Sequence, residues 1–262
     1  MVMETGRAAH SGDEGQFPTR NLLGHRLSCG PESVALRAML TQARRRAGGT
    51  VCFCNVHMCV QGLRDRTLRR ALARAEWVMP DGMPVVMALR LLNARCCERV
   101  AGMDAMPTLC RAAAAEGLKV YFYGSSPTIV AALRRRFARD LPGLDIAGSV
   151  SPPYRPLTAE EEAADLAAIE ASGAHLCFVG LGCPKQELWM DRNRERTGAL
   201  LLGVGAAFAT TAGVQPVAPR WMRDHSLEWL YRLAQEPRRL WRRYATTNPI
   251  FMNLFLRQLW SR

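Results

Sequence analysis

From about Thr50 onward, short apolar runs rich in β-branched and aromatic residues alternate with longer amphipathic segments. This alternation is typical of a parallel β-sheet whose strands are connected by helices. Six runs are predicted to be strands, near residues 50–54, 76–79, 119–123, 144–150, 175–180 and 199–204. The pattern therefore predicts an α/β fold of the Rossmann-like kind, a mostly parallel sheet with helices on both faces.

Two helix starts are marked by residues that cap helices. Ser126 is followed by Pro127, which suits a cap with proline at the first helical position. Thr158 stands three residues before Glu161, the spacing of a capping box, and an alanine-rich segment follows. Helices are expected to begin at both points.

The chain divides into three parts by composition. Residues 1–25 have no apolar stretch of the secretory type and are expected to be a flexible N-terminus. Residues 26–219 hold the alternating pattern and are expected to form the α/β domain. Residues 220–262 contain nine arginines, three acidic residues and eight of the 19 aromatic residues, without β-like alternation. Pro237 and Pro249 are expected to divide this basic helical appendage into about three short helices.

Charge and cysteine usage narrow the function classes. Lys and Arg total 35 against 23 Asp and Glu, a formal net charge of +12, which favours a nucleic acid, a nucleotide or an acidic lipid surface as partner. The nine cysteines include no C-x-x-C pair, and Asp-x-Asp does not occur. A zinc site, a disulfide framework and a metal-dependent diphosphate site are thus disfavoured. We expect no cofactor, no metal ion and a reducing cytoplasm.

Ligands of open parallel sheets bind beyond the carboxyl ends of the strands, so the residues that follow the predicted strands are candidates for a site. Asp81 is the one carboxylate that directly follows a strand, and it is a candidate general base. The alternative is that Asp81 and Gly82 form an ordinary turn. The other candidates at these ends are small or polar: Asn55, Gly124, Ser125, Ser126, Gly182, Lys185 and Gln186.

Several of these candidates suit a phosphate or a sugar. The helix expected after Ser125 and Ser126 offers free N–H groups to a phosphate, and Lys185 and Gln186 suit a sugar or a diphosphate, with simple helix capping as the alternative. A diphosphate bound without metal needs arginine and helix N-termini; Arg99 is one candidate, with a structural ion pair as its alternative. The five histidines are scattered, and core or strand-end roles are favoured for them.

Eight segments, taken in order, resemble the WecG/TagA/CpsF glycosyltransferase family from about residue 30 to residue 250. They are NVHM (55–58), PDGMPV (80–85), ERVAGMD (98–104), YGSSP (123–127), SPPYRPLT (151–158), VGLGCPKQE (179–187), GVGAAF (203–208) and LEWLYRLAQEPRRLWRRY (227–244). The resemblance implies an inverting, metal-independent transferase that moves a sugar from a UDP-sugar onto a saccharide linked to a polyprenyl diphosphate. It implies a cytoplasmic protein bound peripherally to the inner face of the bacterial cell membrane.

The resemblance also implies roles for single residues. Asp81 corresponds to the family's proposed base, and Asn55, Arg99 and Gln186 correspond to its other active-site positions. Asp104, in the same motif as Arg99, is expected to bind substrate. Arg232 and Arg239 are the best matches to the arginines of the family's C-terminal segment, with Arg238 as a rival. Three positions depart from the family pattern: Phe53 replaces a threonine, Ala209 an aspartate and Val217 an arginine. The last two departures suggest an absent ion pair.

Two other function classes remain open at this point. A Rossmann-type oxidoreductase is opposed by the glycine patterns Gly180-x-Gly182 and Gly203-x-Gly205, which both lack the third glycine of the dinucleotide fingerprint. A nucleic-acid-binding protein is suggested only by the basic tail, and the aromatic residues of that tail suit a membrane surface equally well. The favoured partners are a UDP-sugar, a lipid-diphosphate-linked acceptor and an anionic membrane, with no nucleic acid. The resemblance implies N-acetylmannosamine, its uronic acid or a hexose as the donor sugar, and a homo-oligomer is compatible with the sequence.

Overall fold

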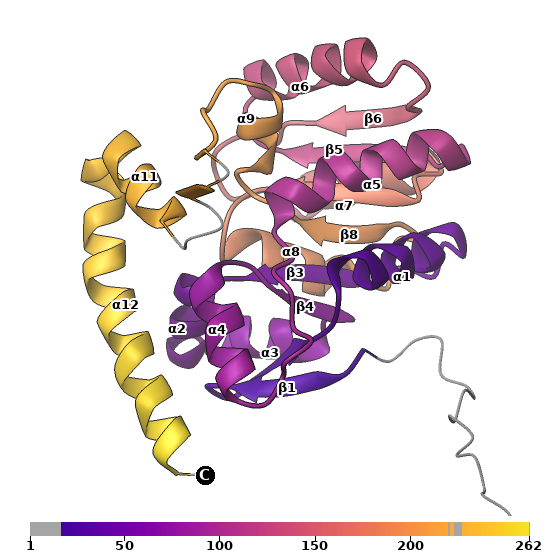
Figure 1. Cartoon of the computed structure of the whole chain (residues 1–262). Helices are drawn as coiled ribbons and strands as arrows, with labels where there is room; N and C mark the ends of the chain where they lie inside the picture. The colour runs from indigo at the N-terminus through magenta and orange to yellow at the C-terminus, as the bar shows by residue number, and fades with distance from the viewer. Residues whose placement is uncertain (1–16, 220, 223–226, 262) are drawn as a thin grey trace, which may run out of the picture.

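The computed structural model describes residues 17–219, 221–222 and 227–261 (Figure 1). The strands are β1 (Thr19–Leu22), β2 (His25–Ser28), β3 (Thr50–Cys54), β4 (Trp77–Pro80), β5 (Val120–Gly124), β6 (Ile146–Val150), β7 (Leu176–Gly180) and β8 (Leu200–Gly203). The helices are α1 (Glu32–Arg44), α2 (Val56–Arg64), α3 (Arg66–Arg74), α4 (Met83–Leu91), α5 (Gly102–Glu116), α6 (Pro127–Asp140), α7 (Ala159–Ala171), α8 (Lys185–Asn193), α9 (Ala207–Thr211), α11 (Glu228–Gln235) and α12 (Pro237–Trp260).

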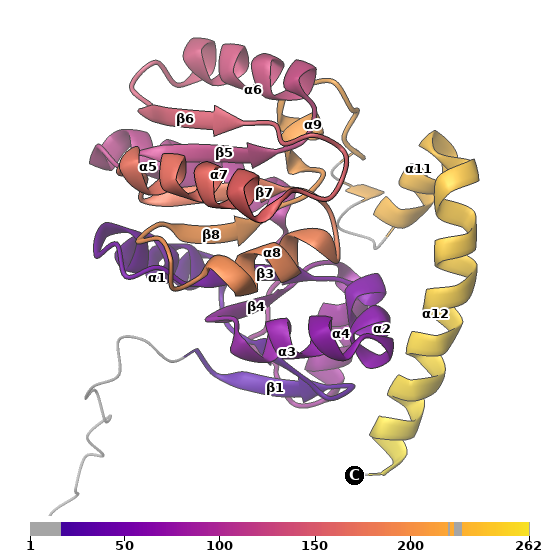
Figure 2. The ribbon, with the colours of Figure 1, turned by 180° about the vertical axis from the view of Figure 1, so that it is seen from behind.

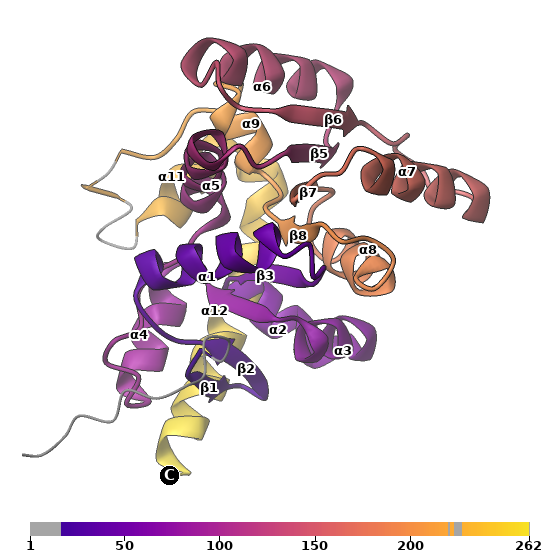
Figure 3. The same cartoon turned by 90° about the vertical axis from the view of Figure 1, so that its right-hand side faces the viewer.

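Strands β3 to β8 form one parallel sheet in the order β4-β3-β8-β7-β5-β6. All six predicted strands are present within one or two residues of their expected bounds. Alternate residues of the strands enter two hydrophobic clusters; Cys52 belongs to one and Phe53 to the other. Helices therefore cover both faces, with α1 and α5 on one side and α7 and α8 on the other (Figure 3). The predicted α/β fold class is confirmed.

Both marked helix starts are also confirmed. The Ser126 hydroxyl accepts the Ile129 N–H at the start of α6, which has Pro127 at its first position. Thr158 and Glu161 form a complete capping box at the start of α7, because each side chain accepts the backbone N–H of the other residue.

The expected flexible N-terminus is wrong for its last residues, because β1 and β2 form an antiparallel hairpin. The turn residues Leu23 and Gly24 have φ of 52° and 78°, the positive pair that a two-residue hairpin turn needs. Leucine is unusual at such a position, so the sequence lacks the Asn-Gly signal of this turn. Leu22 and Leu27 are fully buried and hold the hairpin against the domain.

Residues 228–235 and 237–260 of the appendage are helical, and the expected division at Pro237 is present, because α11 ends at Gln235 and α12 begins at Pro237. The expected division at Pro249 is wrong. Pro249 lies inside the continuous helix α12 rather than at a break. Proline costs a helix interior about 3 kcal/mol, and tertiary contacts offset that cost. Phe251 and Phe255 are buried in the core, and Gln258 accepts the Leu23 N–H and donates to the Asn21 carbonyl. Helix α12 thus lies along the domain from α11 to the β1–β2 hairpin (Figures 1 and 2).

Candidate active site

A cavity of about 840 Å³ lies where the carboxyl ends of the strands face α11 and α12. The sheet edge supplies residues that follow β4, β3, β8, β7 and β5, and the two C-terminal helices close the opposite side. Of the predicted site residues, it is lined by Asn55, Asp81, Arg99, Ser125, Gly182, Gln186 and Arg232. The volume is in the range of sites that bind small molecules.

Asp81 sits at the junction of β4 and α4. Its backbone N–H donates to the Cys54 carbonyl at 2.9 Å, which fixes the end of β4 beside β3. Gly82 follows with φ of 105°, a conformation that L side chains rarely adopt, and α4 begins one residue later. The turn interpretation is therefore correct for the backbone, and this turn is what aims the carboxyl group at the cavity.

The Asp81 carboxyl group has no hydrogen bond and no ion pair with any residue that the structure describes. Burial raises its pKa from 3.8 to about 7; Arg99 and Arg232 oppose this rise, and Glu228 and Asp104 add to it. A carboxyl group with a pKa near neutrality can accept a proton at physiological pH. The position of Asp81 at the cavity and its raised pKa therefore suit a general base.

Arg99 connects the sheet domain to the appendage. Its Nη1 donates to Asp104 at 2.7 Å and its Nη2 to Glu228 at 3.1 Å. Glu228 in turn lies 3.7 Å from Arg232 on the next turn of α11. The predicted ion pair of Arg99 is present, and the same guanidinium lines the cavity, so the structural and functional interpretations of Arg99 coexist.

Asn55 and His57 begin α2 at the cavity wall. The Asn55 side chain caps the helix by accepting the Met58 N–H at 3.1 Å. His57 lines the cavity, and its Nδ1 is buried without a partner among the described residues. Burial, with a further contribution from Arg243, lowers the pKa of His57 to about 4. The imidazole is therefore neutral at pH 7. It lies at the cavity just past the end of β3, so of the core and strand-end positions favoured from the sequence it has the second.

The amide of Gln186 is fully used inside the protein. Its Nε2 donates to the Gly203 carbonyl and to Glu187, both at 2.8 Å, and its Oε1 accepts the Gly182 N–H at 3.1 Å. A side chain at Gly203 would press on this amide, since a Cβ there would lie 3.0 Å from Nε2. Gln186 thus joins the ends of β7 and β8 beneath the cavity.

Three predicted binding residues lie outside the lining of this cavity. Gly124 packs against the Gly180 backbone, where a Cβ would approach to 2.7 Å, and the Ser126 hydroxyl caps α6. The Lys185 ammonium lies 4.8 Å from the centroid of the exposed Tyr154 ring, outside the cavity lining. Backbone geometry, capping and a cation–π contact explain these three residues without a ligand.

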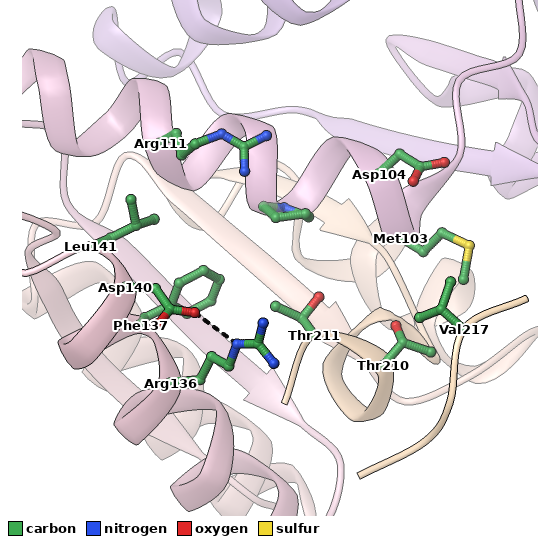
Figure 4. A pocket seen from close by; sticks show the side chains of 11 residues that line it. Met103, Asp104, Arg111, Arg136, Phe137, Asp140, Leu141, Thr210, Thr211 and Val217 are labelled. Atoms are coloured by element: carbon green, nitrogen blue, oxygen red, sulfur yellow. Dashed lines mark hydrogen bonds and ion pairs between the residues drawn. The ribbon is translucent and has the colours of Figure 1, made fainter. Parts of the chain in front are cut away.

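Asp104 lines a second, smaller cavity of about 350 Å³ between α5, α6 and α9 (Figure 4). Its carboxylate is the partner of Arg99, and an ion pair between Arg136 and Asp140 crosses the same cavity wall.

Val217 lines this smaller cavity, whereas the other two departures from the family pattern, Phe53 and Ala209, line the main one. The prediction for the Arg239 side chain lies outside what the structure describes.

Glu228 was not expected at the site, although it lies in the segment 227–244 that resembles the family. The available signal was the spacing of Glu228 and Arg232, four residues apart, which favours an ion pair on a helix. Nothing in the sequence showed that this pair would meet Arg99, because the contact joins segments 129 residues apart.

The described part of the chain contains neither a candidate metal site nor a helix that could span a membrane. No group of three or more His, Cys, Asp or Glu side chains there is arranged to hold a metal ion. No helix within the same residues has both the length and the apolar character needed to cross a membrane.

Comparison with known proteins identifies the family. Residues 20–262 match the model of the glycosyl transferase WecG/TagA/CpsF family. The chain is 32% identical over 204 residues to an N-acetylglucosaminyldiphosphoundecaprenol N-acetyl-beta-D-mannosaminyltransferase of Bacillus spizizenii, covering 78% of this chain and 77% of that protein. It is 30% identical over 203 residues to a protein of the same name from Bacillus subtilis, covering 76% of each. The chain therefore belongs to the WecG/TagA/CpsF family of glycosyltransferases.

Proposed function

We propose that this chain is an inverting, metal-independent glycosyltransferase that moves a sugar from a UDP-sugar to a saccharide on a polyprenyl diphosphate, in the synthesis of a bacterial surface or exopolysaccharide. The names of the two relatives make N-acetylmannosamine the first donor sugar to test and N-acetylglucosamine on undecaprenyl diphosphate the first acceptor. A uronic acid or hexose donor is the alternative. Family membership disfavours the oxidoreductase and the nucleic-acid-binding protein.

The observation that carries the proposal is the Asp81 carboxyl group at the cavity, which has no hydrogen-bond or ion-pair partner among the described residues. In an inverting transfer the acceptor hydroxyl attacks the sugar carbon directly, and one base removes its proton as the nucleotide diphosphate leaves. Two other carboxylates of the described residues line the cavity, but Glu228 is held by Arg99 and Glu236 accepts from Gln215 at 2.6 Å. Asp81 is thus the best candidate for the base.

The leaving diphosphate needs positive charge. Arg99 and Arg232 line the cavity and both act electrostatically on Asp81, so the cations and the base belong to one site. Guanidinium groups bind phosphate oxygens with charge-assisted hydrogen bonds. They supply the stabilisation that a divalent ion supplies in metal-dependent transferases.

The polyprenyl chain of a lipid-linked acceptor stays in the bilayer, so the enzyme needs a surface that docks on the membrane. Helix α12 exposes Trp241, Met252, Leu256 and Trp260, and the last three follow one another at four-residue spacing along one stripe. Exposed arginines occur on the same helix, among them Arg242, and each contributes about 1 kcal/mol near an anionic leaflet. We therefore infer peripheral docking of α12 on the inner face of the cell membrane, beside the cavity.

The test is a donor screen that measures UDP release with a synthetic acceptor, N-acetylglucosamine on a short polyprenyl diphosphate. UDP-N-acetylmannosamine, its uronic acid and UDP-glucose are compared. The proposal predicts that one donor gives UDP release that requires the acceptor. Release that is independent of the acceptor, or no release with any UDP-sugar, would oppose it.

A further inference from the structure

Glu228 holds a position in the cavity wall that no catalytic role explains. One of its oxygens accepts from Arg99 at 3.1 Å and the other lies 3.7 Å from Arg232. The side chains of Glu228 and Arg99 are only 22% and 16% exposed. Water therefore screens this pair weakly. The charges of Glu228 and Arg99 act strongly on each other and on any anion that enters the cavity.

The two arginines that Glu228 engages are the same two that the proposed function assigns to the diphosphate. A carboxylate and a phosphate offer a guanidinium similar pairs of acceptor oxygens. The Glu228 carboxylate lies against Nη2 of Arg99 and near Nε of Arg232, two nitrogens that also suit diphosphate oxygens. Diphosphate oxygens that bind both guanidiniums must therefore displace this carboxylate or share the arginines with it.

We propose that Glu228 is a built-in competitor of the donor diphosphate, which holds Arg99 and Arg232 ready in the empty site and releases them when the sugar nucleotide binds. This inference rests on the proposed function. It goes beyond a clamp between α11 and the segment that precedes α5, because a clamp would help nucleotide binding, whereas a competitor opposes it.

The two roles predict opposite signs in a binding measurement. Glu228→Gln keeps the length of the side chain and one acceptor oxygen for Arg99, but it removes the negative charge. If Glu228 competes, the full-length variant binds UDP about tenfold more tightly than the wild type, as expected when one close charge is removed from an ion-pair site. If Glu228 is only a clamp, UDP binds equally or more weakly.

Uridine is the matched control ligand, because it shares the base and ribose of UDP but has no phosphate. Isothermal titration should give the same uridine affinity for both proteins within about twofold, since no phosphate competes with Glu228. Glu116→Gln, which removes an exposed acid that pairs with Arg44, is the control variant and should leave both affinities unchanged. Glu228→Ala serves as a second variant if Glu228→Gln lowers the melting temperature.

A second readout is the pH dependence of sugar transfer. The charges that act on Asp81 are Arg99, Arg232, Asp104 and Glu228, and Glu228 is one of those that raise its pKa. Without the Glu228 charge the pKa of Asp81 falls, so the rise of kcat/KM with pH should occur at lower pH in Glu228→Gln. The KM for the UDP-sugar should fall in parallel.

The outcomes separate this inference from the proposed function. Tighter UDP binding with unchanged uridine binding supports it. Unchanged or weaker UDP binding by a folded Glu228→Gln, while the wild type still transfers sugar, overturns it and leaves the proposed function intact. A wild type that neither binds UDP nor transfers sugar overturns both.

Discussion

Replacing Asp81 by asparagine should abolish most turnover while leaving the donor bound. The substitution keeps the shape of the side chain and removes its ability to accept a proton. A positioned base contributes about 10²- to 10⁴-fold to a rate, and we expect a loss of kcat of at least about 10²-fold. Because the predicted diphosphate contacts come from Arg99 and Arg232, the Kd for UDP should change little.

The pKa of Asp81 fixes the pH dependence of the wild type. With a pKa of about 7, roughly one tenth of the carboxyl groups are ionised at pH 6 and roughly nine tenths at pH 8. The value of kcat/KM should therefore rise about tenfold between these pH values. In Asp81→Asn this rise should disappear, because no group that titrates there remains in the base position.

The same pKa predicts that Asp81 lowers stability at high pH. Its folded pKa lies above the unfolded value of 3.8, so ionisation is disfavoured in the folded state. The penalty is absent below about pH 4 and complete above about pH 7. Asp81→Asn should therefore have a higher melting temperature than the wild type at pH 8 and an equal one near pH 4.

Steady-state UDP release, isothermal titration and thermal unfolding measure the three effects. Asp145→Asn, the same substitution at an exposed loop position, is the matched control and should behave as the wild type in all three. Turnover of Asp81→Asn within a few fold of the wild type, or a wild-type profile that is flat from pH 6 to pH 8, would refute the assignment of Asp81 as the base.

Gln186, the membrane docking of α12 and the metal dependence of sugar transfer can each be tested separately. Gln186→Ala should lower the free energy of unfolding by about 2 kcal/mol or more, because it leaves buried partners unpaired; unchanged stability in urea would contradict this. Leu256→Asp should reduce flotation with anionic vesicles at low salt, whereas Leu91→Asp, at an exposed leucine of α4, should not; equal effects of the two variants would argue against docking by α12. Transfer should persist in EDTA, and a loss restored by magnesium or manganese would reveal a metal site.

The sheet could be predicted because all its strands except β6 are nearly fully buried. In β3 and β5 every residue is buried, so both strands read as continuous apolar runs, which is typical of a parallel sheet. The hairpin could not be predicted, since Leu23 occupies a turn position that normally carries glycine or asparagine. The continuity of α12 through Pro249 could not be predicted either, because it depends on tertiary packing that leaves no local signal in the sequence.

The site was predictable where a residue follows a strand and not where distant segments meet. Asp81 and Asn55 were found from their positions after β4 and β3. The bond between Gln186 and the Gly203 carbonyl joins two strand ends, and the contact between Arg99 and Glu228 joins the domain to the appendage. Neither leaves a periodic or spacing signal in the sequence.

The most direct test of the central claim is the anomeric configuration of the product formed from an α-linked UDP-sugar. Direct attack by an acceptor hydroxyl deprotonated by Asp81 inverts the sugar carbon, so the account predicts a β-linked sugar on the lipid-linked acceptor, with UDP released in equal amount. NMR spectroscopy of the purified product distinguishes the two anomers. An α-linked product would require a second displacement step and a covalent or ion-pair intermediate, and it would contradict the single-base mechanism.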